Sequence, residues 1–293
     1  MRPRPLPERR SRAKINWTAV TSVISAATAV VALVFTSKSL DSTRDQVALA
    51  EQGQVTDRYT KAVDQLGQQG PDHLQVRLGG IYALERLARD SPRDQPTIIE
   101  ILAAFARTTS GTRTNGTCPA QPPAPDIVAA ITVLSRRDVT RDNRAVIDLR
   151  NACLRGLDLK SLSGDETAPS PNLAGADLAG ADLSGAMLQS VDLARANLGG
   201  TNLTEAQLSF ATLTGSFFTG TNLSHAGLSS ADLDGAKFVK VKLVGAYLRY
   251  ANISRAVVLD TDLSGADLTD TRHEATQIGQ SVITDKATVG AWW

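Results

Sequence analysis

Histidine and cysteine are the residue types that most often bind metals or act as nucleophiles and bases, and this 293-residue chain has three of the first and two of the second. His73, His225 and His273 lie far apart in the sequence, and no Cys/His spacing suits a zinc site. No glycine-rich loop lies between a strand and a helix, and no Gly-x-Ser-x-Gly motif is present. The sequence therefore predicts no catalytic residue, metal ligand or cofactor, and we expect that the protein is not an enzyme.

Aspartates are numerous, and paired carboxylates can act as general acid and base. Here they regularly stand just before a leucine, as at Asp177 and Asp182, which indicates outward-facing residues of a repeat. Matches to Asn-x-Ser/Thr at Asn202, Asn222 and Asn252 are by-products of the same repeat. Cys118 and Cys153 neither specify nor exclude a disulfide, and we interpret them as two unrelated thiols.

The repeat runs from Asn172 to Thr269, where a leucine or its substitute recurs at every fifth residue from Leu173 to Leu268. Two residues before nineteen of these twenty central positions stands a small or β-branched residue, alanine in thirteen cases. Residues i and i+2 of an extended chain point to the same face, so both can point inward. Glycine follows nine of the central positions by two residues, as expected where the backbone must bend. Each unit of five is predicted to be a short strand and a turn.

A second period of twenty gives the number of sides in each coil. Phe218 and Phe238 are twenty apart, and the non-alanine small positions Thr201, Thr221, Val241 and Thr261 have the same spacing. Stacked residues should resemble one another, so we predict four units in each coil, five coils, and an interior filled by leucine without a ligand cavity.

The runs 176–180, 181–185 and 266–268, which read ADLAG, ADLSG and ADL, resemble the pentapeptide repeat family. That resemblance implies a right-handed quadrilateral β-helix but names no activity, because a fold does not determine a function. The helical stretch 76–88 is similar to the region that precedes the repeats in many membrane-anchored actinobacterial members. The high leucine and alanine content, with 42% hydrophobic and only 4% aromatic residues, also favours a solenoid.

Residues 17–35 form nineteen uncharged positions, fourteen of them apolar, and as a helix they would extend about 28 Å. The segment lacks the cleavage pattern of a secretory signal peptide, so we predict a single membrane span; a buried soluble helix is the alternative. Six basic residues against Glu8 in residues 1–14 favour a cytoplasmic N-terminus and repeats outside the cell, by the positive-inside rule.

The predicted fold class is mainly β, a right-handed quadrilateral β-helix preceded by a small α-helical region and an N-terminal transmembrane helix. In chain order we expect a disordered basic tail (1–14), the transmembrane helix (15–37), an α-helical domain (41–108) that covers the first coil, a linker (109–125), a short helix capped by Asp126 (126–138), the β-helix (146–270) with a loop at 163–171, and a C-terminal cap or tail (271–293).

Charge is uneven along the repeats, although the whole chain has a net charge of only +1. Six acids and one base occupy residues 172–234, whereas five bases and one acid occupy residues 235–260. We predict that the basic residues of this segment, with nearby aromatic residues, form a patch that contacts a partner or the membrane surface. The alternative is a face that is simply solvated. The patch consists of Phe210, Lys237, Lys240, Lys242, Tyr247, Arg249, Tyr250 and Arg255.

Two functions follow as hypotheses. The first is a membrane-tethered, non-enzymatic scaffold that binds an unknown protein partner, with no small-molecule substrate and no nucleic acid. The second comes from the family, some soluble members of which resemble DNA in size and charge and bind or protect gyrase. The membrane anchor and the reversal of charge along the repeats favour the first.

Overall fold

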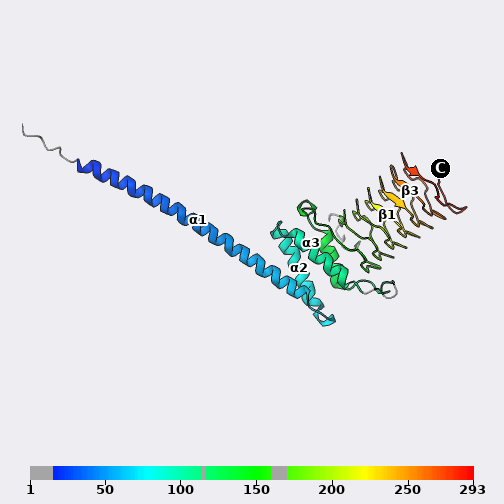
Figure 1. The fold of residues 1–293 in the computed structure, drawn as a ribbon, viewed down its shortest axis with the longest axis horizontal. Coiled ribbons are helices and arrows are strands. Elements are labelled where there is room, and N and C mark those ends of the chain that lie inside the picture. Colours follow the sequence, from blue (N-terminus) through cyan, green and yellow to red (C-terminus); the bar gives the residue numbers. More distant parts are fainter. Residues whose placement is uncertain (1–15, 112, 114–115, 160–169) are drawn as a thin grey trace, which may run out of the picture. The chain divides into compact units, whose positions relative to one another are not determined.

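The computed structural model describes residues 16–111, 113, 116–159 and 170–293, and it divides the chain into two compact units between Asp57 and Arg58. Helix α1 (Trp17–Leu66) begins in the first unit and ends in the second (Figure 1). Its described side chains up to residue 57 are nearly all exposed, and its length and composition would allow it to cross a membrane. The helix continues where the sequence predicts two separate segments, because residues 38–57 contain no proline and a single glycine.

Three further helices pack together in the second unit: α2 (Leu74–Asp90), α3 (Gln95–Thr109) and α4 (Pro125–Ser135). Short 3-10 turns at Pro71–His73 and Val139–Arg141 flank them. The apolar side chains between the three helices are buried, including Ile81, Leu84, Ile98, Leu102, Ile131 and Leu134. Helix α2 ends before Ser91-Pro92, and Pro96 lies in the first turn of α3, as the sequence predicts.

Asp126 does not cap α4 as the sequence predicts. The helix begins at Pro125 and its N-cap is Ala124, because the fixed φ of proline suits the first helical position. The Asp126 carboxylate is instead 3% exposed and accepts a hydrogen bond of 2.6 Å from Nε of Arg77 on α2. This buried ion pair joins α2 to the start of α4.

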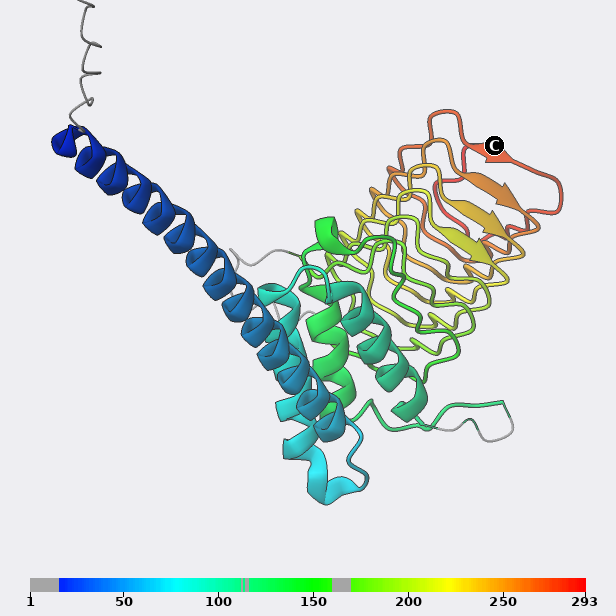
Figure 2. The same ribbon diagram turned by 60° about the vertical axis from the view of Figure 1, so that its left-hand side comes forward.

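The remainder of the second unit is a β-helix whose coils stack through parallel backbone pairs (Figure 2). Most pairs join residues twenty apart, such as Asn202 with Asn222, which confirms four five-residue sides in each coil. We name the sides by the outward residue before each central position: side A holds 177, 197, 217, 237, 257 and 277; side B 182, 202, 222, 242 and 262; side C 187, 207, 227, 247 and 267; side D 172, 192, 212, 232, 252 and 272.

The interior of the β-helix contains the central residues and the small residues that precede them. Leu198, Leu228 and Ala246 are fully buried. The rings of Phe218 and Phe238 stack with centroids 4.8 Å apart, as their spacing of twenty predicts. Leucine and alanine therefore close the interior, as expected from the sequence.

Among the described residues, extended strands form on side A alone: β1 (Phe217–Thr219), β2 (Lys237–Val239), β3 (Val257–Leu259) and β4 (Gln277–Ile278), which pair in parallel in that order. β-Branched and aromatic residues favour longer pairing there. The other sides pair through single bridges, because the turn occupies the rest of each unit. The chain is thus only partly sheet, and the expectation of a mainly β chain is corrected to a helical region followed by a β-helix.

The corner residue, two positions after each central residue, adopts a left-handed backbone conformation in every unit from 173 to 268. Gly180 has φ of 68°, and the much larger Phe210 and Tyr250 have 62° and 60°. Eleven of the twenty corners are not glycine. The turn thus imposes this conformation whatever residue occupies the corner.

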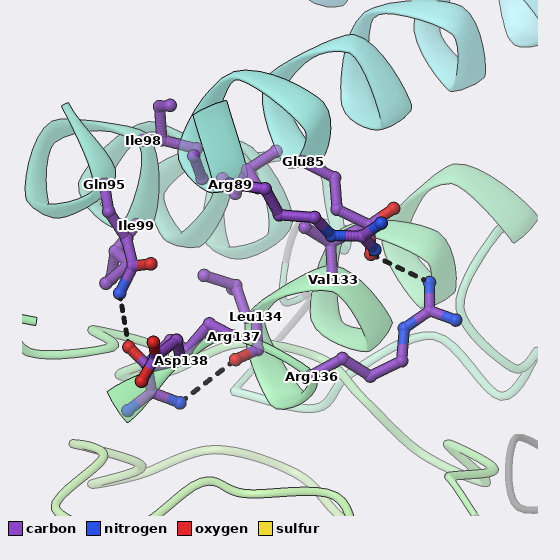
Figure 3. A pocket seen from close by; sticks show the side chains of 12 residues that line it. Glu85, Arg89, Gln95, Ile98, Ile99, Val133, Leu134, Arg136, Arg137 and Asp138 are labelled. Carbon is purple, nitrogen blue, oxygen red and sulfur yellow. Dashed lines mark hydrogen bonds and ion pairs between the residues drawn. The ribbon is translucent and has the colours of Figure 1, made fainter. Parts of the chain in front are cut away.

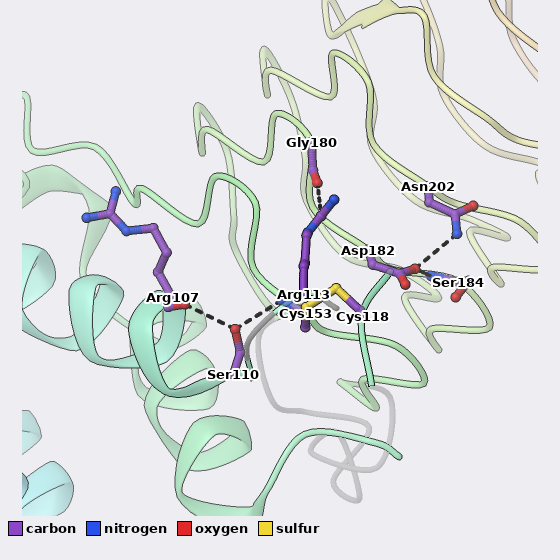
Figure 4. Close-up of a disulfide and its surroundings, with 9 residues drawn as sticks. All are labelled: Arg107, Ser110, Arg113, Cys118, Cys153, Gly180, Asp182, Ser184 and Asn202. Carbon is purple, nitrogen blue, oxygen red and sulfur yellow. Dashed lines mark hydrogen bonds between the residues drawn. A yellow bond between two sulfur atoms is a disulfide. The ribbon is translucent and has the colours of Figure 1, made fainter. Parts of the chain in front are cut away.

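Cys118 and Cys153 form a disulfide, with Cα atoms 5.4 Å apart, so the interpretation as unrelated thiols was wrong (Figure 4). The backbone N–H of Cys153 donates to Oγ of Ser110 at 3.0 Å, and the Arg113 guanidinium donates to the carbonyl of Gly180. The described part of segment 109–125, predicted as a linker, is therefore attached to the first coils. The two cysteines lie 35 positions apart in the sequence, so their proximity arises only from tertiary structure.

Helix α4 contacts the first coil, which begins with Asp148 paired to Asp177. The backbone N–H of Asn172 donates to the carbonyl of Ser135 at 2.8 Å, and Arg137 Nη1 donates to the carbonyl of Asn172 at 2.7 Å. Asp148 and Asp177 are 29 residues apart, and not twenty, because segment 160–169 lies between them. That segment, with most of the predicted loop 163–171, lies outside the described residues, and so does the predicted tail 1–14.

At the other end of the β-helix, the indole of Trp292 stacks on His273 with ring centres 4.0 Å apart. Trp293 packs edge-on against Trp292, at 4.8 Å. Both tryptophans line a small space with Ile253 and Ile278 from the last coils.

The contact between α2 and the end of α1 depends on Gly80. A Cβ at Gly80 would lie 2.7 Å from the carbonyl oxygen of Ala62, whereas one at Gly79 would have only the Gln65 side chain within 4 Å, at 3.9 Å. Gly80→Ala should lower the free energy of unfolding by about 1 to 2 kcal/mol, because overpacking outweighs the gain in helix propensity. Gly79→Ala should raise it by up to about 1 kcal/mol. Thermal unfolding of the full-length variants by circular dichroism tests the difference, and equal effects at both positions would contradict the close packing.

Candidate interaction surface

The outward aspartates of the repeat complete the turns. Oδ1 of Asp182 accepts the backbone N–H of Ser184 at 3.0 Å, and Asp192 and Asp262 make the same contact two residues onward. Asparagines on a neighbouring coil donate to two of these carboxylates: Asn202 to Asp182 and Asn172 to Asp192, both at 3.1 Å. These bonds give the carboxylates a structural role in each corner and between coils.

The three histidines are not brought together. Nδ1 of His73 lies 2.7 Å from the carbonyl oxygen of Gln69, His225 occupies a corner between sides B and C, and His273 stacks on Trp292. Within the described ranges, no group of three His, Cys, Asp or Glu side chains could hold a metal ion.

The residues of the predicted patch lie on different sides of the β-helix. Lys237 is on side A, Lys240 at the corner that follows, and Lys242 on side B. The other members lie elsewhere: Tyr247 and Arg249 on side C, opposite side A, Phe210 and Tyr250 at the corner after side C, and Arg255 at the corner after side D. One flat partner surface could contact the lysines or the tyrosines, but not both groups.

Several patch residues also have partners within the chain. Nε of Arg255 donates to Asp234 at 2.8 Å. The Arg249 guanidinium lies 3.8 Å from Asp267 and 5.8 Å from the centre of the Tyr250 ring. The Lys237 ammonium lies 5.1 Å from the centre of the Phe217 ring.

The structure brings together an apolar surface that the sequence analysis missed. One side of the sheet formed by strands β1 to β4 carries this surface, which we name the β1–β4 face. It consists of the outward side chains on its first three strands: Phe217 and Thr219 on β1, Lys237 and Val239 on β2, and Val257 and Leu259 on β3. Phe217 is 42% and Leu259 37% exposed. Equivalent outward positions on earlier coils carry Asp177, Ala179 and Asn197. The signal for this face in the sequence is the spacing of twenty between outward residues such as Phe217, Lys237 and Val257, which places them side by side.

Comparison with known proteins gives a consistent set of matches. A family model described as pentapeptide repeats matches residues 172–204, 201–239 and 242–272, in eight copies. A pentapeptide repeat protein from the thylakoid lumen of Arabidopsis thaliana is 34% identical over 33% of this chain and 68% of its own, with a TM-score of 0.33. No curated protein matches the chain.

Two other solved structures are also similar. HetL, a pentapeptide repeat protein of Nostoc sp. strain PCC 7120 involved in the regulation of heterocyst differentiation, is 27% identical over 49% of this chain and 74% of its own, with a TM-score of 0.20. A trypsin-treated variant of QnrB1, a plasmid-mediated fluoroquinolone resistance protein, is 17% identical over 47% of this chain and 82% of its own, with a TM-score of 0.29.

Ion pairs lower the pKa of several surface carboxyls. The hydrogen bond from Arg150 is the main reason that the pKa of Asp148 lies far below its usual range, and the nearby charge of Arg107 on α3 adds to it. Arg255 lowers the pKa of Asp234 in the same way, but this arginine is 72% exposed. Asp148 therefore links the helical region to the first coil electrostatically.

Asp148→Asn should destabilise the protein at neutral pH by about 1 to 2 kcal/mol, through loss of charged hydrogen bonds. A lowered folded-state pKa contributes stability above the unfolded pKa of about 4, and that contribution is lost as the pH falls toward the folded value. The difference between wild type and variant should therefore shrink from pH 7 to pH 3 in urea unfolding. Asp234→Asn, with its exposed partner, should show a smaller difference. A difference for Asp148→Asn that is independent of pH would contradict this assignment.

Proposed function

Because this chain belongs to the pentapeptide repeat family, we propose that it is a membrane-tethered, non-enzymatic scaffold that binds a partner protein on the β1–β4 face of its β-helix. The interior is filled by leucine, alanine and phenylalanine, so the outer surface is what the repeats offer to a partner. The observation that carries the proposal is the apolar composition of this one face. Elsewhere the outward residues of the repeats are mainly polar or small, apart from Met187 and Tyr247 on side C and the corner residues Phe210 and Tyr250.

The chemistry of the face defines the partner. Phe217 and Leu259 are exposed, and Val239 and Val257 are half-buried between them on flat paired strands. Aromatic and aliphatic side chains of this kind supply most of the binding energy in protein interfaces. Lys237 lies within the face, and Lys240 and Lys242 border it. Asp260 and Asp262 stand one coil later, beside Lys240 and Lys242. We expect an apolar partner surface with acidic groups opposite Lys237.

The membrane anchor is α1. Its first part has the length and apolar composition of a membrane span, and its described side chains there are exposed. A soluble helix with this composition would bury its apolar side chains to gain stability. Together with the helical region before the repeats, this supports a protein of the membrane-anchored type.

Two independent features support a location of the repeats outside the cytoplasm. The basic residues of segment 1–14 favour a cytoplasmic N-terminus. The disulfide between Cys118 and Cys153 favours an oxidising compartment, because cytosolic thiols are kept reduced. A single span places the second unit on the side opposite the N-terminus, which agrees with the disulfide. Gyrase lies in the cytoplasm, so this topology favours the scaffold over a gyrase ligand.

Photocrosslinking in intact cells tests the proposal. Replacing Phe217 by benzoylphenylalanine keeps an aromatic side chain on the β1–β4 face, and the same replacement of Tyr247, which is 55% exposed on opposite side C, is the matched control. We expect one discrete protein adduct from position 217, none from position 247, and a weaker adduct when Lys237→Glu is added.

The outcomes separate the parts of the proposal. An adduct from position 247 but not 217 would move the interface to side C, and no adduct from either would contradict the scaffold. A discrete adduct at position 217 with a cytoplasmic protein would leave the scaffold intact but overturn the topology.

A further inference from the structure

The helical region contains a partly enclosed cavity of about 220 Å³ between α2, α3 and α4 (Figure 3). Its apolar lining comes from α3 and α4 and is almost fully buried: Ile98, Ile99, Leu102, Val133 and Leu134 are each at most 5% exposed. The proposed scaffold function makes no use of this cavity. It also lies away from the β1–β4 face, on different elements of the second unit.

The volume suits a small organic molecule. An engineered apolar cavity of about 150 Å³ in another protein stays dry and binds benzene. A cavity of about 220 Å³ has room for one aromatic ring with short substituents at its two ends. A longer lipid tail would not fit within it.

One end of the cavity presents an unused hydrogen-bond acceptor. Gln95 is 3% exposed, and its Nε2 donates to the carbonyl of Asp138 at 2.7 Å and to Oδ1 of Asp142 at 2.9 Å. Both partners only accept, so they fix the orientation of the amide and turn Oε1 away from them (Figure 3). No described residue donates to Oε1. A ligand with a hydroxyl group at this end of the cavity would supply the donor.

The other end presents excess positive charge. Glu85 Oε1 accepts from Arg89 Nη2 at 2.7 Å and lies 3.3 Å from Arg136 Nη2. One carboxylate thus faces two guanidinium groups, which leaves one positive charge and several N–H donors unbalanced. Arg89 and Arg136 are 70% and 44% exposed, so their free N–H groups are accessible. A ligand carboxylate would balance this cluster.

The remaining charged groups of the lining are satisfied within the chain. Arg137 pairs with Asp142 and donates to the carbonyls of Leu134 and Asn172. Asp138 accepts from Thr140 and pairs with Arg141. The charges of Arg137 and Asp138 are therefore balanced by neighbouring residues. The Glu85 end of the cavity is the place where an anion would be favoured.

We propose that this cavity binds a small aromatic hydroxy acid, with its ring against Ile98, Leu102 and Val133, its hydroxyl donating to Gln95 Oε1 and its carboxylate between Arg89 and Arg136. Each feature of the ligand corresponds to one feature of the lining. The ring replaces empty apolar space, the hydroxyl supplies the missing donor, and the carboxylate balances the charge.

Calorimetric titration of the full-length protein in lipid nanodiscs tests this with three probes. 4-Hydroxyphenylacetate should bind at a single saturable site. Phenylacetate lacks the hydroxyl and should bind about tenfold more weakly, since it cannot donate a hydrogen bond to Gln95 Oε1. Tyramine carries an amine in place of the carboxylate and should bind at least about tenfold more weakly. No saturable binding of any probe, or equal binding of tyramine and the acid, would overturn the proposal.

Two variants locate the site. Arg136→Gln should weaken binding of 4-hydroxyphenylacetate by about tenfold with little change in unfolding temperature, whereas Arg150→Gln, which changes an exposed arginine of the first coil, should leave binding unchanged. Ala88→Leu, which fills part of the cavity from α2, should abolish binding. Binding that survives both Arg136→Gln and Ala88→Leu would show that the probe binds elsewhere and would overturn the assignment.

Discussion

The left-handed corner is the constraint on which the β-helix depends. A side of five residues directs one small and one large residue inward, and the backbone must then turn before the next inward position. All twenty corners from 175 to 270 have positive φ, although eleven are not glycine. Such a conformation costs about 1 to 2 kcal/mol at a non-glycine residue, whereas burying a leucine contributes about 1.5 to 3 kcal/mol. The buried column outweighs the cost of the corners, and side-chain bonds such as Asp182 to Ser184 support the turns.

This constraint divides the chain into residues that define the fold and residues that are free to vary. Inward positions accept leucine, alanine or a close substitute, and Phe218 and Phe238 fit because they stack on each other. Outward positions pack less than inward ones; apolar residues there favour strand pairing on side A, but the coils of the other sides form without them. The scaffold proposal rests on the gathering of Phe217, Val257 and Leu259 on one side, where Phe217 and Leu259 are exposed.

The period of five and the recurrence at twenty were sufficient to predict the repeat, its four sides and its filled interior, because these depend on contacts between residues at fixed spacing. Tertiary contacts were not predictable in this way. The pairing of Cys118 with Cys153 and the ion pair between Asp126 and Arg77 join segments without any periodic relation. The cavity beside Gln95 depends on how three helices pack, which no spacing records. The β1–β4 face had a signal in the sequence, but only once outward residues are aligned coil by coil.

We propose that the exposed apolar residues of the β1–β4 face bind a partner and are not needed for the protein to fold. The most direct measurement is the adduct yield from a benzoylphenylalanine at Val239, in intact cells, with and without the substitutions Phe217→Thr, Val257→Thr and Leu259→Thr. Threonine keeps the β-branched shape that strands favour, so the unfolding temperature should be nearly unchanged. We predict that the adduct falls to background while the protein stays folded. An undiminished adduct in the folded triple variant would contradict it.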